Sequence, residues 1–176
     1  STPLYSSAAS DVYKRQIILD IDHRPYTWGS IQEASRTYFK AAEISDIVIG
    51  NDDEFGVMAE DYNEGRKLAQ QLSKSTASIV IYKMGEQGSI TFAENEKIKT
   101  GIFQVDALKP TGAGDAFMGV FISSLLNKKS IKDSVIYGSA AAAIVVTKVG
   151  CSSAMPYYDE LELFVKENTI KKFGEN

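Results

Sequence analysis

The sequence predicts an α/β fold: a mostly parallel sheet with helices on both faces. Three short apolar runs, at 17–21, 46–50 and 77–82, have the length and the β-branched content of strands that are buried on both sides. Longer segments with helically spaced apolar residues separate these runs. Strands that alternate with helices pair in parallel, because each helix returns the chain to the edge where the next strand starts.

The first helix is predicted from its boundaries. Pro25 and Gly29 break the chain after the strand at 17–21, and Ser30 is placed to cap a helix that runs to about Ala42. After the strand at 46–50 we expect a short helix from 51 and a helix that is capped by Asn63 and reaches about Leu72. The strand at 77–82 should be followed by a turn at Gly85 and Gly88, a hairpin partner at 89–93 and one or two strands within 97–105. The rest of the chain is expected to form a helix from Gly112 to Leu126, a helix capped by Ser130 and a last helix from Tyr157 or Asp159.

Composition and charge exclude several classes of protein. The 176 residues are enough for one domain with a sizeable core, and the net charge of -4 argues against a nucleic-acid partner. No apolar run approaches the length of a membrane span. The single cysteine, Cys151, cannot form an internal disulfide, so the cytoplasm is the expected compartment. The single histidine, His23, excludes mechanisms that need a histidine pair.

The first sixteen residues differ from the rest of the chain. Residues 1–16 are rich in Ser, Ala and Thr at their start, have no periodic pattern and lack the apolar core of a signal peptide. We expect a disordered leader or a junction there, and folded sequence over 17–176. Because the folded part opens abruptly on a strand, we expect a chain that lacks an amino-terminal part.

One motif suggests chemistry. Gly112 and Gly114 flank Ala113 where a loop becomes a helix, and small residues there let the backbone approach a phosphate. The first N–H groups of a helix have no internal acceptors and point at such an anion. Asp115 would repel a phosphate, but as a base it could accept a hydroxyl proton beside the anion. The alternative is a Gly-rich helix start whose Asp is favoured by the helix dipole.

The run Thr111–Gly119 resembles the second signature of the ribokinase/PfkB family of carbohydrate kinases. The resemblance extends from about Ile17 to about Leu163. It implies a three-layer, ribokinase-like (Rossmann-like) fold from which the amino-terminal part and the sugar-binding lid are missing. It also implies ATP-dependent phosphorylation of a sugar or sugar acid, with Asp115 as the catalytic base and Gly112, Ala113 and Gly114 as the anion hole.

The same resemblance implies further contacts with the nucleotide. These fall on Asn51, Glu54, Lys83, Gly85, Gly88, Gly138 and Ala142. The first two match an Asn-x-x-Glu motif that holds Mg²⁺ and phosphate largely through water; the next three match a strand-end turn; the last two lie in a small-residue helix against which adenine packs. The alternatives are a helix cap, a plain hairpin turn and close helix packing.

The end of the first strand suggests the acceptor. Arg24 could pair with a carboxylate or phosphate, or form a structural salt bridge. Many family members have Asn where this chain has Asp22. The run 20–28 resembles the 5-dehydro-2-deoxygluconokinases of the family, which implies 5-dehydro-2-deoxygluconate, in myo-inositol catabolism, as acceptor. A 2-dehydro-3-deoxygluconokinase, a fructokinase, a ribokinase and an inactive nucleotide-binding fragment remain alternatives.

One departure concerns a cation. Family members that need potassium usually carry an Asp six positions before the base, whereas this chain has Lys109. An ammonium group repels a cation, so we expect Lys109 to replace it and the monovalent cation not to be required. The expected partners are therefore ATP, Mg²⁺ and a small sugar or sugar acid, without nucleic acid or membrane. A homo-oligomer of the full-length protein stays open, and we expect little kinase activity from this chain alone.

Overall fold

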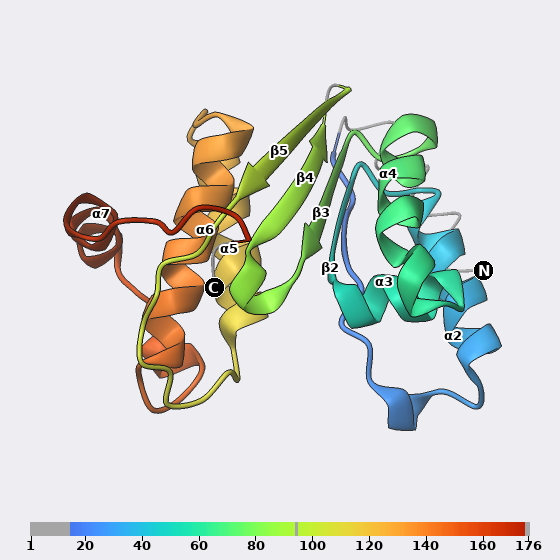
Figure 1. Cartoon of the computed structure of the whole chain (residues 1–176), viewed down its shortest axis with the longest axis horizontal. Coiled ribbons are helices and arrows are strands. Elements are labelled where there is room, and N and C mark those ends of the chain that lie inside the picture. The colour runs from blue at the N-terminus through green and yellow to red at the C-terminus, as the bar shows by residue number, and fades with distance from the viewer. Residues whose placement is uncertain (1–14, 94, 175–176) are drawn as a thin grey trace. The chain divides into compact units, whose positions relative to one another are not determined.

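The computed structural model describes residues 15–93 and 95–174, and these form two compact units (Figure 1). The first unit holds 15–85 with 89–98, and the second holds 86–88 with 99–174. The predicted leader lies outside the described residues, except for Arg15 and Gln16. In the described part of the chain, no helix is both long and apolar enough to cross a membrane.

The sheet is mixed, and its strands follow one another in space as in the sequence. They are β1 (Ile18–Asp20), β2 (Ile47–Asn51), β3 (Ile79–Lys83), β4 (Ser89–Ala93) and β5 (Glu96–Thr100). The first three pair in parallel, and β4 pairs antiparallel with β3. The α/β class, the parallel strands and the hairpin are therefore confirmed. Val48, Ile49, Val80 and Ile81 have no exposed surface, as expected of strands covered on both sides.

Three helices accompany the parallel strands: α2 (Ile31–Ala42), α3 (Asp52–Ala59) and α4 (Gly65–Ser75). In Figure 1 they lie together beside β2 and β3, and contacts join α2 to α3 and α3 to α4. The Ser30 hydroxyl accepts the Glu33 N–H at 3.1 Å, so the predicted cap of α2 is confirmed. A short 3-10 turn, η1 (Pro25–Thr27), links β1 to this helix.

The predicted cap at Asn63 is wrong. The capping side chain is Asp61, whose carboxylate accepts the Asn63 N–H at 2.9 Å and starts a 3-10 turn, η2 (Tyr62–Glu64). Helix α4 follows directly at Gly65 and has no side-chain cap. Both Asp and Asn are good caps, and the aspartate two residues earlier captures the N–H of the asparagine itself.

The second unit is built on two packed helices, α5 (Ala113–Leu126) and α6 (Ile131–Val146). Their small residues let them approach closely, since a Cβ atom on Gly138 would lie 2.9 Å from the Phe117 carbonyl oxygen. The Phe117 ring stacks on Phe121, which is fully buried. The Ser130 hydroxyl accepts the Asp133 N–H at 3.0 Å, so its cap is confirmed.

The carboxy-terminal part of this unit is held by charge and by backbone hydrogen bonds. After the short turn η4 (Ser152–Ala154), helix α7 (Tyr158–Glu167) places Glu162 beside α6, where its carboxylate accepts the Tyr137 hydroxyl at 2.9 Å. Hydrogen bonds from Tyr158, Tyr137 and Lys129 lower the pKa of Glu162. The segment after α7 is anchored by the Lys171 N–H, which donates to the Ile102 oxygen at 2.8 Å. The turn η3 (Gly85–Gln87) receives the Gly174 N–H at 3.2 Å, on the Gln87 oxygen.

Two glycines of the packed pair should respond oppositely to alanine. Gly138→Ala forces a methyl group against the Phe117 backbone, and we expect a loss of about 1–3 kcal/mol in the free energy of unfolding. Gly119→Ala places its methyl in open space within α5, and we expect a gain of about 0.5–1 kcal/mol. Denaturant unfolding measures both changes. Equal effects of the two substitutions would contradict the close packing of these helices.

Candidate active site

Polar side chains collect at the carboxyl ends of the parallel strands in the first unit. Asn51 and Lys83, the last residues of β2 and β3, are direct partners in the sheet register. The loop that contains Asp22 and Arg24 follows β1, which pairs with β2. Ligands of open α/β sheets bind beyond this edge, because the loops and helix starts gather there. The first unit therefore brings Arg24, Asn51, Glu54 and Lys83 to one edge of the sheet.

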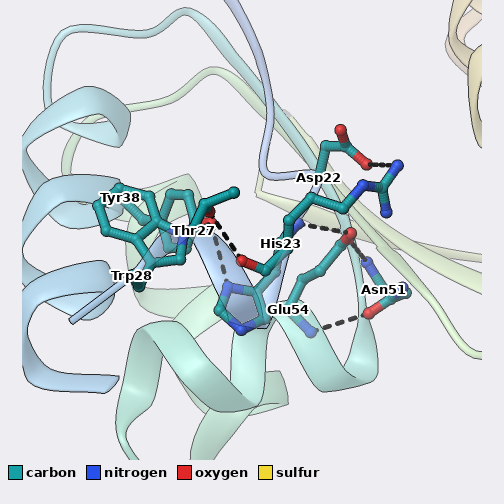
Figure 2. A network of polar contacts seen from close by, with 8 residues as sticks. Asp22, His23, Thr27, Trp28, Tyr38, Asn51 and Glu54 are labelled. Atoms are coloured by element: carbon teal, nitrogen blue, oxygen red, sulfur yellow. Dashed lines mark hydrogen bonds and ion pairs between the residues drawn. The ribbon is translucent and has the colours of Figure 1, made fainter. Parts of the chain in front are cut away.

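Glu54 links two of these strand ends through its carboxylate (Figure 2). Its Oε2 accepts the Asn51 N–H at 2.6 Å, while the Asn51 side-chain oxygen accepts the Glu54 N–H at 2.8 Å. Together these bonds form a complete capping box at the start of α3. The other carboxylate oxygen, Oε1, accepts the His23 N–H at 3.3 Å from the loop after β1. Glu54 is only 8% exposed, so this carboxylate is a buried joint between the two loops.

This arrangement sets limits on a metal at Glu54. Each carboxylate oxygen already accepts a backbone N–H, although each has a second lone pair. The described residues contain no group of three or more His, Cys, Asp or Glu side chains that could hold a metal ion. Mg²⁺ usually keeps several waters and takes only one or two carboxylates together with phosphates. The residues therefore fit a hydrated Mg²⁺ that also binds a nucleotide, and they do not form an all-protein metal site.

An aromatic network supports the loop after β1. The Trp28 indole N–H donates to the Tyr38 hydroxyl at 3.0 Å, and the His23 Nδ1 lies 3.1 Å from the same oxygen (Figure 2). Both rings meet the Tyr38 ring edge to face. Burial raises the pKa of Tyr38 above its ordinary 10.0, so the phenol keeps its proton, which it can donate to His23. The spacing of His23, Trp28 and Tyr38 in the sequence gives no sign of this network.

The predicted acid-binding residue has a partner within the loop. The Arg24 guanidinium pairs with the Asp22 carboxylate at 2.7 Å, and the two side chains are 55% and 59% exposed. The structural salt bridge that the sequence analysis kept as an alternative is therefore present. Asp22 has a left-handed backbone with φ of 38°, a conformation that Asp and Asn adopt more readily than most residues.

The second unit places the Gly-Ala-Gly-Asp motif at the start of α5, as predicted. Gly112 is the N-cap residue, and its φ of 89° favours glycine. The Ala113 N–H donates to the Pro110 oxygen at 3.3 Å, whereas the N–H groups of Gly114 and Asp115 find no acceptor among the described residues. The Asp115 side chain is exposed beside them. Within the part of the chain that the structure describes, the helix thus starts with two N–H groups that lack acceptors and with an exposed carboxylate.

The loop before this motif is fixed by its backbone. The N–H groups of Leu108 and Lys109 both donate to the Val146 oxygen at the end of α6, at 2.8 and 3.2 Å. The Lys109 side chain is exposed. This anchoring positions the chain that leads into Gly112 without using the charge of the lysine.

The remaining predicted contacts are glycines and one alanine. Gly85 and Gly88 have φ of 52° and 94°, so the turn after β3 needs residues that tolerate a left-handed backbone. A Cβ atom on Gly88 would also collide with Thr100 and Gly101. Gly138 packs against Phe117, and Ala142 on the same helix is half-buried. The turn and packing alternatives therefore account for these glycines, and they leave a nucleotide role as a prediction.

The structural role of Glu54 can be tested by removal of its side chain. Glu54→Ala leaves the partly buried N–H groups of His23 and Asn51 without their acceptor, and we expect a loss of about 1–3 kcal/mol in unfolding free energy. Faster amide exchange at both N–H groups should accompany it. The control Asp53→Ala removes an exposed carboxylate from the same turn, with an expected cost of about 0.3–1 kcal/mol. Unchanged exchange at His23 in Glu54→Ala would show that the carboxylate does not join the two loops.

The sequence of this chain is similar to curated proteins over most of its length. The chain is 40% identical over 155 residues to the 5-dehydro-2-deoxygluconokinase of Photobacterium profundum, which covers 85% of this chain and 47% of that protein. It is 38% identical over 154 residues to the 5-dehydro-2-deoxygluconokinase of Bacillus subtilis (strain 168), with 86% and 47% covered. The chain thus spans about half the length of these relatives.

Solved structures show the same fold, which confirms the ribokinase-like expectation. Ribokinase from Thermotoga maritima matches with a TM-score of 0.76 at 27% identity, over 92% of this chain and 52% of that one. A putative ribokinase II from E. coli, solved with ATP and Mg²⁺, matches with a TM-score of 0.80 at 24% identity, over 92% and 52%. The family model described as pfkB family carbohydrate kinase matches residues 8–157. The chain belongs to the pfkB family of carbohydrate kinases.

Proposed function

We propose that the protein carrying this chain transfers the γ-phosphoryl group of ATP to a hydroxyl group of a sugar acid, and that 5-dehydro-2-deoxygluconate is the acceptor. The start of α5 is the observation that carries the proposal. Two backbone N–H groups there lack acceptors among the described residues, and the exposed Asp115 carboxylate lies at the same helix end. The matched relatives that bear the name of this kinase support the choice of acceptor.

The chemistry assigns one task to each group. Asp115 accepts the proton of the acceptor hydroxyl as its oxygen forms a bond to the γ-phosphorus and the bond from that phosphorus to ADP breaks. The N–H groups of Gly114 and Asp115 stabilise the charge on the transferring phosphoryl group. Gly112 permits the left-handed backbone that orients these N–H groups. Ala113, whose N–H donates to the Pro110 oxygen, has a side chain too small to block the approach of a phosphate.

The other predicted residues bind the nucleotide and its metal ion. Lys83 ends β3 beside Asn51, where its ammonium suits a phosphate, and the turn with Gly85 and Gly88 offers backbone without side chains. Mg²⁺ supplies neutralisation of phosphate charge when it is bound, and Glu54 with Asn51 would hold its waters. Gly138 and Ala142 would form the apolar contact for adenine. Arg24 would pair with the carboxylate of the acceptor.

The relatives that the chain matches are about twice as long, and their remaining half includes residues that this chain does not contain. We propose that this half supplies most of the acceptor pocket, so that the chain alone binds nucleotide but transfers phosphate slowly or not at all. A coupled ADP-release assay with 5-dehydro-2-deoxygluconate, run on this chain and on the full-length Photobacterium profundum relative, measures the difference. Equal turnover by both proteins would refute this division of labour.

Removal of the proposed base should separate binding from chemistry. Asp115→Asn keeps the size of the side chain but cannot accept a proton at neutral pH, and it removes a charge that repels phosphate, so we expect equal or tighter binding of a non-hydrolysable ATP analogue to this chain. The equivalent substitution in the full-length Photobacterium profundum relative should lower kcat by at least about 100-fold, the range of general base catalysis. Calorimetry and the coupled assay measure the two quantities. Full turnover in the substituted relative would exclude this carboxylate as the base.

Lys109 leads to a prediction about monovalent cations. If its ammonium takes the place of a cation near α5, affinity of this chain for the ATP analogue should be the same in potassium chloride and in tetramethylammonium chloride at equal ionic strength. Lys109→Asp should introduce a preference for potassium, and Lys128→Asp, an equal charge change elsewhere in the same unit, should not. A strong potassium requirement of the unsubstituted chain would contradict the replacement.

A further inference from the structure

The loop after β1 has a fixed backbone. The Ile21 N–H donates to Ile49 at 3.0 Å, the His23 N–H donates to Glu54, and the Arg24 oxygen accepts both the N–H and the hydroxyl of Thr27, at 3.0 and 2.8 Å. The aromatic network around Tyr38 also binds this loop through His23. A hydrogen-bonded backbone therefore presents the side chains of Asp22 and Arg24 at the carboxyl edge of the sheet.

Unlike this hydrogen-bonded backbone, the side chains of Asp22 and Arg24 are accessible to solvent. Their ion pair is 2.7 Å long, and more than half of each side chain is exposed to solvent. An exposed pair of this kind contributes little net free energy, because water and salt compete for both charges. A second carboxylate can therefore replace Asp22 on the guanidinium, and the fork of Arg24 suits a carboxylate in geometry. The replaced Asp22 would then hydrate at the surface.

We propose that Asp22 is an internal competitor for Arg24: its carboxylate occupies Arg24 in the free protein, and the carboxylate of an incoming sugar acid takes its place. This proposal rests on the proposed function for its ligand class. A neutral sugar lacks the charge that displaces Asp22, so the pair stays closed against it. The Asp22 carboxylate acts as a competitor within the loop and lowers the affinity for every acid by the fraction of time that it holds Arg24.

The magnitude follows from the strength of such pairs. Exposed ion pairs correspond to a ratio of paired to free arginine of about one to four, so Arg24 is free for about one half to one fifth of the time, and removal of the competitor should raise acid affinity by about two- to five-fold. Asp22→Asn keeps the size of the side chain and a residue that tolerates the left-handed backbone. Arg24→Gln removes the receiving charge, and in the double variant the effect of Asp22→Asn should vanish.

The test is a titration of this chain, without nucleotide, with 5-dehydro-2-deoxygluconate, followed by the NMR signal of the Arg24 Nε–H. The matched control is Glu64→Gln, which breaks the Glu64–Lys67 pair, also 2.7 Å long and similarly exposed, and changes the net charge by the same amount. We expect about two- to five-fold tighter binding in Asp22→Asn, loss of binding in Arg24→Gln, and no change in Glu64→Gln. Neutral 2-deoxyglucose should not shift the Arg24 signal.

Several results would overturn the proposal. They are unchanged or weaker acid binding in Asp22→Asn, acid binding that survives in Arg24→Gln, and a gain in Glu64→Gln equal to that in Asp22→Asn. Tighter binding of inorganic phosphate than of the sugar acid would assign the site to phosphate and overturn the carboxylate. Because the titration contains no ATP, a failure of phosphoryl transfer in the kinase assay leaves this result standing, and the two proposals fail separately.

Discussion

The candidate site in the first unit depends on one buried carboxylate. Glu54 accepts the N–H groups of Asn51 and His23, and so it fixes the start of α3 against the loop after β1. A buried charge of this kind is costly unless its hydrogen bonds are made, and here both oxygens have a donor. Without that joint the loop after β1 would lose its direct connection to the start of α3, although the pairing of β1 with β2 would remain.

The candidate site in the second unit is formed mainly by backbone N–H groups at the start of α5. A helix start offers N–H groups that attract an anion, and a glycine with a left-handed φ aims them without side-chain bulk. An aspartate at such a place would oppose a phosphate by its charge, and its proposed role as the base accounts for its presence there. The first unit thus offers side chains with defined partners, whereas the second offers donors and a base without partners among the described residues.

Much of this fold follows from the sequence, because burial on both faces and helical spacing leave direct marks on it. The apolar runs that became β1, β2 and β3 and the caps at Ser30 and Ser130 were all readable in this way. The cap at Asn63 was not, since Asp61 competes for the same backbone and local pattern does not rank the two. The predicted start of a helix is therefore wrong where two nearby residues can both act as its cap.

The candidate site likewise contains features that the local sequence predicts and features that it does not. The Gly-Ala-Gly-Asp motif has a fixed spacing within one helix start, so its geometry follows from the sequence. The joint from Glu54 to His23 spans 31 positions, and the contact of Tyr38 with Trp28 depends on how α2 lies against a loop. Such contacts arise from tertiary packing, and no periodic pattern records them. The Asp22–Arg24 pair is local, but its sequence fits equally well with a free arginine.

The central claim is that the start of α5 receives the phosphates of a nucleotide. The most direct measurement is the change in the backbone amide NMR signals of this chain when a non-hydrolysable ATP analogue and Mg²⁺ are added. The account predicts that the signals of Gly114 and Asp115, whose N–H groups lack acceptors among the described residues, shift more than those of the other helix starts, such as Ile131 after Ser130. Saturable binding that leaves these two signals unmoved would contradict it.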